Sequence, residues 1–285
     1  MEIKASQVKE LRDMSGVAMM ECKRALVECE GDLEKALDLL RSNSSLKAEK
    51  KSSRVAADGV IRIVSSDSYA TIIEINSETD FAAKDPGFIA FADDVVNYVS
   101  NNKVDDISMF ASTEIEEKRL ALIQKIGENI QLRRMETIEF DNTMSVGSYM
   151  HSDGKLATLV VTSNSDDNLA KDVAMHVAAS NPLCKTPDDI DSEVLEREKA
   201  IFEVQAKESG KDDAIMNKMV EGKVRKFLAE VSLTSQAFIK DPDMTVGKLL
   251  SDNGADVTGY VRFKVGEGIE VETKSFADEV ADQLK

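Results

Sequence analysis

Apolar residues recur every three or four positions through the first 41 residues, which is the spacing of helix faces that pack inward. The pairs Ser15-Gly16 and Gly31-Asp32 supply turns, and Asp32 is placed to cap the helix that follows. The pattern predicts three short helices. Their inward residues are Val8 and Leu11, then Ala18, Cys22, Ala25, Leu26 and Cys29, then Leu33, Ala36, Leu37 and Leu40. A module this small binds other molecules more often than it catalyses a reaction.

The segment Ser42–Arg54 is rich in Ser, Lys and Arg and has little to bury. It is predicted to be either a linker or a solvated extension of the third helix. From Ala57 onward, strand-like and helix-like runs begin, which indicates a new domain. We therefore assign residues 1–54 to an N-terminal three-helix module with its linker and residues 55–140 to a first core subdomain.

The stretch Asn76–Phe88 closes a strand-like run and opens a helix-like one. Before it, Tyr69–Ile75 is rich in β-branched and aromatic residues, as a half-buried strand is. After it, one inward helix face is predicted from the spacing of Phe88, Phe91, Ala92, Val95, Val96 and Val99. Because Pro86 disfavours helical geometry at the residue before it, the long helix is predicted to begin near Gly87, and any turn after Thr79 is short.

Phe81 is therefore predicted to lie on a short protruding turn. Three residues near it can accept hydrogen bonds from the free N–H groups of a helix start: Ser77, Thr79 and Asp80. Position alone leaves two interpretations of Phe81. It either folds back as a hydrophobic staple beneath its own helix or stays exposed for a partner.

A second helix of this subdomain is predicted to start at Thr113, which has capping-box spacing to Glu116. The helix carries Ile115, Leu122, Ile123 and Ile126 and stops at Gly127, before a strand that contains Ile130 and Leu132. Gly127 is most simply a helix-terminating glycine. Such a terminus also leaves carbonyl groups and bare backbone available to a partner.

An internal repeat is indicated when the chain is laid against itself at a shift of 87 residues. Ala70-Thr71 then falls on Ala157-Thr158, and Ala83-Lys84-Asp85 falls on Ala170-Lys171-Asp172. The repeat fails where the first copy has Thr79-Asp80-Phe81, because the second copy has Asp166-Asp167-Asn168 there. The fold therefore does not require an aromatic residue at this position, which favours Phe81 as an exposed functional residue.

The polar, proline-free region from Asp188 to Leu228 has two helix-like runs, joined by a turn at Ser209-Gly210-Lys211. It is interpreted as a projecting antiparallel helical hairpin inserted into the second repeat, and the alternative is two ordinary core helices. The apolar positions are Val194, Leu195, Ile201 and Val204, then Ile215, Met219, Val220, Val224 and Phe227. We assign residues 187–227 to this arm.

A second core subdomain is assigned to residues 141–186 and 228–263, on either side of the arm. Strand-like sequence is predicted from Val231, and the last strand, Thr258 to Val265, is punctuated by Gly259 and Gly266. In the remaining residues, 264–285, one apolar stripe four residues apart predicts a C-terminal docking helix through Phe276, Val280 and Leu284.

The composition of the 285-residue chain narrows the classes of partner. A net charge of -17 disfavours binding to nucleic acid or to anionic membranes, because phosphate contacts need clustered Lys and Arg, and it favours a protein partner. No apolar run approaches the roughly 20 residues of a membrane span, and the amino terminus has no apolar signal core. We therefore expect a cytoplasmic protein.

The three cysteines are expected to be reduced. Cys22 and Cys29 are about 10 Å apart along a helix, which is too far for a disulfide, and Cys184 stands alone.

Catalytic motifs are absent from the sequence. No glycine-rich phosphate loop with its Lys-Ser/Thr is present, and Gly266-Glu267-Gly268 is most simply a turn. His176 shares a helix face with apolar residues and is expected to be a hydrogen-bonded core histidine, whereas His151 is expected on an exposed hairpin turn. With 53 carboxylates, proximity between two of them says nothing of acid–base chemistry. We therefore predict no enzyme, no metal and no cofactor.

Several separated motifs resemble the bacterial elongation factor Ts family, and the resemblance runs essentially end to end. The motifs are Leu11-Arg12 with Cys22-Lys23-Arg24-Ala25-Leu26, Ser77-Glu78-Thr79-Asp80-Phe81-Ala82-Ala83-Lys84, Lys125-Ile126-Gly127-Glu128-Asn129-Ile130, Met175-His176-Val177-Ala178-Ala179-Ser180, and Val257-Thr258-Gly259-Tyr260-Val261-Arg262-Phe263. Two departures stand in the second motif: Ser77 where the family often has cysteine, and Ala82 where it often has a larger aliphatic residue. They leave Asp80 and Phe81 intact but could soften the packing beneath them.

The resemblance implies an α+β fold with a ubiquitin-associated-like N-terminal module and two related α/β-sandwich-type core subdomains with antiparallel sheets. It also implies an inserted helical hairpin that acts as a dimerisation arm, and a C-terminal helix. The implied activity is guanine-nucleotide exchange on elongation factor Tu, both GDP-bound and nucleotide-free. A homodimer or a heterotetramer would form through the hairpin.

Residue by residue, the resemblance implies that Thr79, Asp80, Phe81 and Ala82 enter the partner near its magnesium site, and that Ile126 and Gly127 contact it too. His151 is a further candidate contact. A GTPase holds its nucleotide through phosphate oxygens, backbone N–H groups and magnesium, so displacing that shell removes affinity without any bond being made. The leading alternative is a non-exchanging adaptor. A hydrolase or transferase is disfavoured because no nucleophile and base pair is evident.

Overall fold

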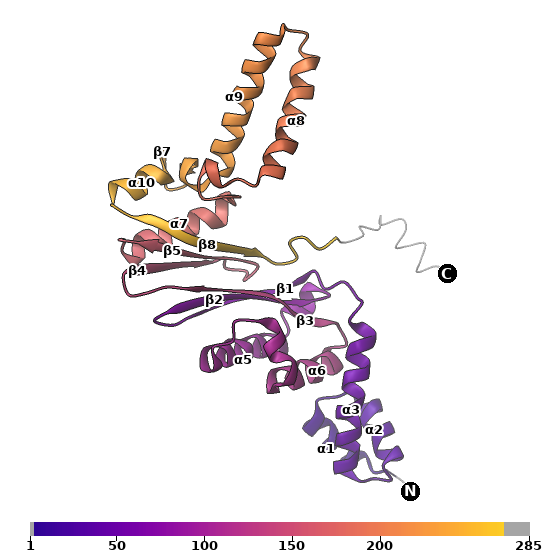
Figure 1. Ribbon diagram of the computed structural model, residues 1–285. Helices are drawn as coiled ribbons and strands as arrows, with labels where there is room; N and C mark the ends of the chain where they lie inside the picture. The colour runs from indigo at the N-terminus through magenta and orange to yellow at the C-terminus, as the bar shows by residue number, and fades with distance from the viewer. Residues whose placement is uncertain (1–2, 271–285) are drawn as a thin grey trace.

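The computed structural model describes residues 3–270, which form an α+β fold with antiparallel sheets, as predicted (Figure 1). The stripe Phe276, Val280 and Leu284 lies outside the described residues, so the C-terminal docking helix stays a prediction. Across residues 3–270, no helix combines the length and the apolar character that spanning a membrane would need.

The N-terminal region forms the three predicted helices, α1 (Ala5–Ser15), α2 (Met19–Glu28) and α3 (Leu33–Lys51). They enclose a small apolar core of Val8, Leu11, Val17, Cys22, Ala25, Leu26, Ala36 and Leu40. Asp32 caps α3 by accepting a hydrogen bond from the backbone N–H of Lys35 at 3.1 Å, as the sequence indicates.

Helix α3 continues to Lys51, so the segment from Ser42 is a helical extension and not a linker. The extension is not fully solvated, because Ser44 and Ala48 are buried and Ala48 joins the core of the following subdomain. Two small residues four positions apart leave room for another helix to approach closely, and α3 packs on α6 (Glu114–Ile126). The N-terminal helices are thereby fixed to the core.

The first repeat has strand order β1-β2-β3, with β1 Asp58–Ser65, β2 Tyr69–Ser77 and β3 Ile130–Glu139. Between β2 and β3 the chain forms α4 (Asp80–Ala83), α5 (Pro86–Asn102), the short 3₁₀ helix η1 (Ile107–Ser112) and α6. Apolar residues of α5 and α6 pack against Ile73 and Ile75 of the central strand.

Thr113 caps α6 as predicted, since its side chain accepts a hydrogen bond from the N–H of Ile115. The predicted capping box is wrong. Glu116 pairs instead with Arg119 one turn later, at 2.7 Å, because an arginine partner offers a charged, two-pronged contact.

The second repeat has strand order β4-β5-β8, with β4 Met144–Met150, β5 Leu156–Ser163 and β8 Asp256–Lys264, and α7 (Asp167–Ser180) packs on it. Its remaining elements are η2 Pro187–Asp189, α8 Ser192–Glu208, α9 Asp213–Val231, η3 Leu233–Ser235, β6 Ala237–Phe238, β7 Asp241–Thr245 and α10 Val246–Asp252. Helices α8 and α9 form the predicted antiparallel hairpin, which projects from the rest of the molecule (Figure 1).

The internal repeat is confirmed by the strand registers. The central strands β2 and β5 each carry a register shift, between Glu74 and Ile75 in one and between Val161 and Thr162 in the other. These positions are 87 residues apart, the shift that aligns the two sequences. Both sheets are therefore built to one plan, including the bulge.

The two sheets stack face to face, and the helices of each repeat cover the outer face of its own sheet (Figure 1). The layer between the sheets is apolar and contains Ile61, Ala70 and Ile72 of the first sheet and Ala157, Leu159, Val261 and Phe263 of the second. Alternate residues of each strand point to opposite faces, so β2 supplies this layer and the helix-facing layer at once.

The strand-like sequence predicted from Val231 is only partly strand, since this region contains the short strands β6 and β7 and also the helix α10. Of the two glycines that punctuate the last strand in the sequence, Gly266 follows its end, whereas Gly259 lies inside β8 beside the bulge. A glycine within a strand is often found at such an irregularity.

Candidate functional site

The short helix α4 positions Phe81 at the end of β2. Thr79 caps it, since its hydroxyl accepts a hydrogen bond from the N–H of Ala82 at 3.2 Å. Ala82 and the residue after it are buried, whereas the side chain of Phe81 is 82% exposed. Because a four-residue helix has one inward side, burying the alanines turns Phe81 outward. The staple interpretation is therefore wrong, because the side chain is exposed, and the role of Phe81 toward a partner stays a prediction.

Pro86 keeps this turn separate from the long helix. It is the first residue of α5, and Asp85 caps α5 by accepting a hydrogen bond from the N–H of Gly87 at 2.7 Å. In the second repeat, Asp166 caps α7 three residues before Leu169, at 2.8 Å, and α7 then runs unbroken for 14 residues. The first repeat thus has a protruding turn where the second has a continuous helix.

Asp80 lies beside Phe81 on the partly exposed face of the turn. Its carboxylate accepts a hydrogen bond from Lys84 Nζ at 2.7 Å, and this contact lowers the pKa of Asp80 and raises the pKa of Lys84. Asp80 is therefore a carboxylate at neutral pH. Since the pair is open to solvent, the carboxylate can exchange its lysine partner for another cation at small cost.

Gly127 ends α6 with a positive φ of 89°, and its N–H donates to the carbonyl of Ile123 at 2.9 Å. This is the helix-terminating glycine that the sequence predicts. Gly127 is exposed and Ile126 is half-buried, so the glycine backbone faces solvent.

The Gly127 loop and the Phe81 turn are joined by hydrogen bonds. Glu128 accepts from the hydroxyl of Thr79 at 2.7 Å and from its N–H at 3.0 Å, while Glu78 accepts from the N–H of Asn129 at 2.6 Å. The structure therefore brings together two of the three segments that the sequence singles out. Sequence reasoning does not identify Glu78, Glu128 and Asn129 as site residues, although all three stand inside the family motifs.

His151 lies on the exposed turn between β4 and β5, as predicted, and its Nδ1 is 3.0 Å from Asp153. The turn is tied to β1, because the carbonyl of Gly154 accepts from the N–H of Ile61 at 2.8 Å. Lys155 pairs with Asp58 at 2.8 Å, and Asp58 stands opposite Ser77 in the sheet. The turn therefore lies beside the strand end that leads into α4.

His176 is a core residue, as predicted. Its Nδ1 accepts from the N–H of Ile239 at 3.2 Å, which leaves the ring proton on Nε2 to donate to Gln236 at 3.0 Å. Burial lowers the pKa of His176, so the ring is neutral at physiological pH. Within residues 3–270, no cluster of three or more His, Cys, Asp or Glu side chains is arranged to hold a metal ion.

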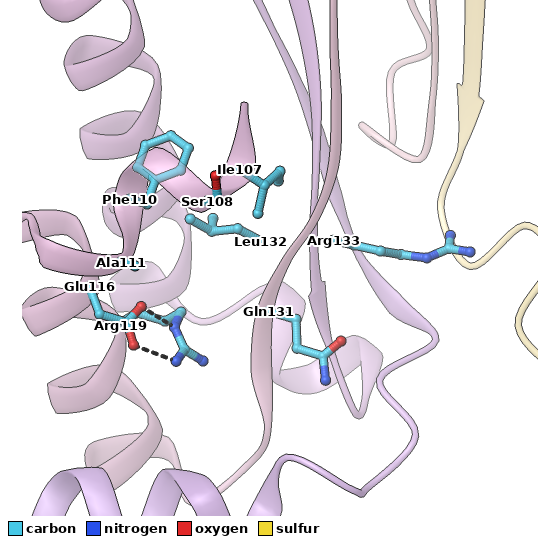
Figure 2. Close-up of a pocket in the computed structure, with 9 residues that line it drawn as sticks. All are labelled: Ile107, Ser108, Phe110, Ala111, Glu116, Arg119, Gln131, Leu132 and Arg133. Atoms are coloured by element: carbon cyan, nitrogen blue, oxygen red, sulfur yellow. Dashed lines mark hydrogen bonds and ion pairs between the residues drawn. The ribbon is translucent and has the colours of Figure 1, made fainter. Parts of the chain in front are cut away.

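A cavity of about 420 Å³ lies elsewhere, between η1, α6 and the edge strand β3 (Figure 2). Two of its charged lining residues pair with each other, since Arg119 donates to both carboxylate oxygens of Glu116, and Arg119 also donates to the carbonyl of Ile130. Figure 2 shows the guanidinium of Arg133 directed away from the other lining residues. The charged side chains that line the cavity are thus either paired with protein groups or directed away from it, and we assign the cavity no function.

Comparison with known proteins gives consistent matches. The family model described as Elongation factor TS matches residues 78–267. Elongation factor Ts of Hahella chejuensis is 51% identical over 285 residues, which cover 99% of each chain. The elongation factors Ts of Saccharophagus degradans and Teredinibacter turnerae are 49% and 47% identical, covering all of this chain and 98% of each relative.

Proposed function

The chain belongs to the elongation factor Ts family of translation elongation factors, and on that premise we propose that it is the guanine-nucleotide exchange factor of elongation factor Tu. In this proposal it binds the GDP-bound partner, disturbs its magnesium and phosphate site, and promotes GDP release so that GTP can bind. It does so in the cytoplasm, by binding alone, with no covalent step and no cofactor.

The observation that supports this proposal is the exposure of Phe81 on a capped turn. Among the exposed large hydrophobic residues of the described chain Phe81 is the most exposed, at 82%, and large aromatic residues are common anchors of protein interfaces. Ala82 packs beneath the turn and supports it. Phe81 would enter the partner near its magnesium site.

Asp80 and Gly127 supply the other contacts of the proposed interface. Asp80, a partly exposed carboxylate, would compete for the ion and water network that holds the phosphates. Ile126 and the bare backbone of Gly127 would dock beside it, and His151 would extend the contact from the second repeat. Loss of the phosphate shell lowers nucleotide affinity without bond breakage.

Exchange of this kind requires a ternary complex in which factor and nucleotide weaken each other's binding. By thermodynamic reciprocity, saturating GDP must weaken the affinity of the chain for elongation factor Tu by the same ratio that the chain weakens GDP. Equal affinity for the nucleotide-free and GDP-bound partner would rule the mechanism out, because a ligand without differential affinity shifts no equilibrium.

A matched pair of substitutions tests the role of Phe81. Asn168 holds the equivalent position in the second repeat and is also exposed. Phe81→Ala should slow catalysed GDP release at least about tenfold, because a buried aromatic anchor contributes roughly 2 kcal/mol or more. Asn168→Ala should change release much less. Release is measured by stopped flow with fluorescent GDP on elongation factor Tu.

Melting temperatures complete that test. Since Phe81 is exposed, Phe81→Ala should leave the melting temperature within about 2 °C of wild type. A variant that exchanges at the wild-type rate would remove Phe81 from the mechanism. Failure of the wild-type chain to accelerate GDP release at all would reject the proposed function.

The second candidate function is a non-exchanging adaptor that associates through the hairpin of α8 and α9. Its specific support is the exposure of three apolar side chains on the hairpin, Ile201, Val204 and Ile215. Such residues are commonly covered in an assembly, and a homodimer or a heterotetramer with elongation factor Tu would cover them. Binding to elongation factor Tu without GDP release would favour this candidate.

A further inference from the structure

We propose that Glu128 is a positioning residue, which holds the Phe81 turn in the geometry that engages the partner. Glu78 supports the junction between this turn and the Gly127 loop from the other side, through Asn129. The inference rests on the proposed exchange function, because Phe81 is the group whose position matters. Glu128 itself need not touch the partner. It acts through Thr79.

The contacts of Glu128 set the orientation of the cap of α4. One carboxylate oxygen accepts a hydrogen bond from the hydroxyl of Thr79 at 2.7 Å, and the other accepts a hydrogen bond from the backbone N–H of Thr79 at 3.0 Å. With its proton directed to Glu128, the Thr79 hydroxyl presents a lone pair to the N–H of Ala82 at 3.2 Å. The carboxylate thus fixes both the backbone and the hydroxyl of the residue that starts the turn.

Glu78 fixes the other side of the junction to a buried residue. It accepts from the N–H of Asn129 at 2.6 Å, and Asn129 is 1% exposed. The amide of Asn129 donates to the carbonyls of Ser52 at 3.4 Å and Arg54 at 2.9 Å. The junction is therefore fixed by hydrogen bonds to the segment that follows α3.

Helix α4 needs an external support of this kind. Four residues are far fewer than the roughly 12 at which an isolated helix becomes even marginally stable, because the first turn costs more entropy than its few hydrogen bonds offset. Burial of Ala82 and Ala83 supplies only two small side chains. The two bonds from Glu128 add charge-assisted contacts at the end where α4 begins.

The second repeat shows that the fold does not require this carboxylate. Gln131 stands opposite Asn76 in the first sheet, and Asp256 stands opposite Ser163 in the second, so Glu128 corresponds to Asn253. The side-chain amide of Asn253 donates to the carbonyl of Leu249 at 2.8 Å, within its own helix end. The carboxylate contact is therefore found in the repeat that carries the exposed aromatic residue.

A rigid turn would favour exchange because less conformational freedom is lost when Phe81 enters the partner. Removal of the carboxylate should leave Phe81 present but poorly placed. Glu128→Ala should then slow catalysed GDP release in the same way as a partial loss of the Phe81 contact. It should have no further effect when Phe81 is already replaced.

The central experiment compares Glu128→Ala with the matched control Asn253→Ala in catalysed GDP release. Glu128→Ala should lower kcat/KM about tenfold, since two hydrogen bonds to a charged group are lost, and Asn253→Ala should lower it less than about twofold. Glu128→Gln should recover most of the loss, because its amide oxygen can still accept from the N–H of Thr79. Equal effects of Glu128→Ala and Asn253→Ala would overturn the inference.

Double substitution separates positioning from direct contact. In a Phe81→Ala background, Glu128→Ala should lower kcat/KM by less than about twofold, because its route to the partner is gone. A full additional tenfold loss would show that Glu128 acts independently of Phe81, and the inference would be wrong.

Hydrogen exchange of the free protein provides a readout that does not depend on the partner. Glu128→Ala should speed amide exchange in residues 79–85 while the melting temperature stays within about 2 °C of wild type. Unchanged exchange rates in this segment would overturn the positioning role even if GDP release were slow. The wild-type chain could fail to accelerate GDP release from elongation factor Tu while Glu128→Ala still speeds amide exchange in residues 79–85. That result would reject the proposed function, and the contact between Glu128 and Thr79 would stand.

Discussion

Glu74 is a charged residue on the central strand of the first sheet, with no exposed side-chain surface. It pairs with Arg133 at 2.9 Å and with Arg134 at 2.6 Å, and it accepts from the N–H of Gly266 at 2.8 Å. The bulge explains the double pairing. Arg134 stands opposite Glu74 in the ladder, and Arg133 is the extra residue, so two consecutive side chains reach one carboxylate.

Glu74→Gln should lower the free energy of unfolding at pH 7 by about 2 kcal/mol, because hydrogen bonds to a charged group contribute about 1.5–3 kcal/mol. Burial alone would raise the pKa of Glu74, but the bonds from Gly266, Arg134 and Arg133 outweigh it, and the pKa lies below its ordinary value of 4.5. The contribution is therefore present above pH 4.5 and is lost as the pH falls through the lower folded-state pKa.

Urea unfolding at several pH values measures this effect. The difference between wild type and Glu74→Gln should be largest near neutral pH and should narrow in acid, below about pH 4. A difference that stays constant across that range would mean that the charge of Glu74 is not what stabilises the fold.

Individual residues are predictable where the signal is local. The cap at Thr79 and the helix end at Gly127 in the site, and the core position of His176 outside it, each follow from neighbours within a few positions. The exposure of Phe81 is predicted only when the sequences of the two repeats are compared. Glu78 and Glu128 could not be assigned because each bonds a residue about 50 positions away, and nothing in the local pattern specifies a partner at that distance.

Among the elements, α7 crosses β4 at a point where there is no room for a side chain. A Cβ on Gly147 would lie 2.1 Å from the carbonyl carbon and oxygen of Ala170. Gly147→Ala must therefore push the helix off the sheet, and it should lower the free energy of unfolding by about 2 kcal/mol or more.

Gly222 in α9 is the contrasting position, since a Cβ added there would meet no atom within 4 Å and the helix is regular. Gly222→Ala should raise the free energy of unfolding of the hairpin by about 1 kcal/mol, because alanine is the better helix former. Denaturant titration followed by circular dichroism checks both variants. Equal destabilisation by the two substitutions would contradict the packing argument.

The elements that sequence periodicity misses are short or interrupted. Helix α10 has seven residues, too few for a periodic pattern, and the nearby strand-like residues mask it. The 3₁₀ helix η1 has six residues and one buried aromatic side chain, Phe110. The pattern leaves the end of helix α3 open between a linker and a helical extension because Ser44 and Ala48 are small, yet their size is what lets α6 approach. Tertiary packing decides each of these cases.

At the scale of the whole molecule, the hairpin of α8 and α9 leaves the core through a narrow base. The N–H of Leu183 donates to the carbonyl of Val231 at 2.8 Å, and the N–H of Leu233 donates to the carbonyl of Cys184 at 2.9 Å. The two chain segments that enter and leave the hairpin are thus held side by side without it.

Replacing residues 193–230 by a flexible linker of about six residues should leave the core folded, with a melting temperature within about 3 °C of wild type. If the hairpin mediates self-association, light scattering should show that any dimer of the wild type is lost in the variant. A large fall in melting temperature would show instead that the hairpin is part of the core. Retained dimers would place the interface elsewhere.

The unbroken helix α7 and the interrupted pair α4 and α5 have a consequence for selection. Selection can act differently on the same position in the two repeats, since Asp166 only caps its own helix α7, whereas Phe81 is exposed beside the cap of α4 and contacts a partner in the proposed function. In cells that depend on this chain, substitutions at positions 166–168 should reduce growth only as far as they reduce the amount of folded protein. At positions 79–81, growth should fall even when protein abundance is normal. Saturation mutagenesis with paired growth and abundance readouts would therefore distinguish the two copies.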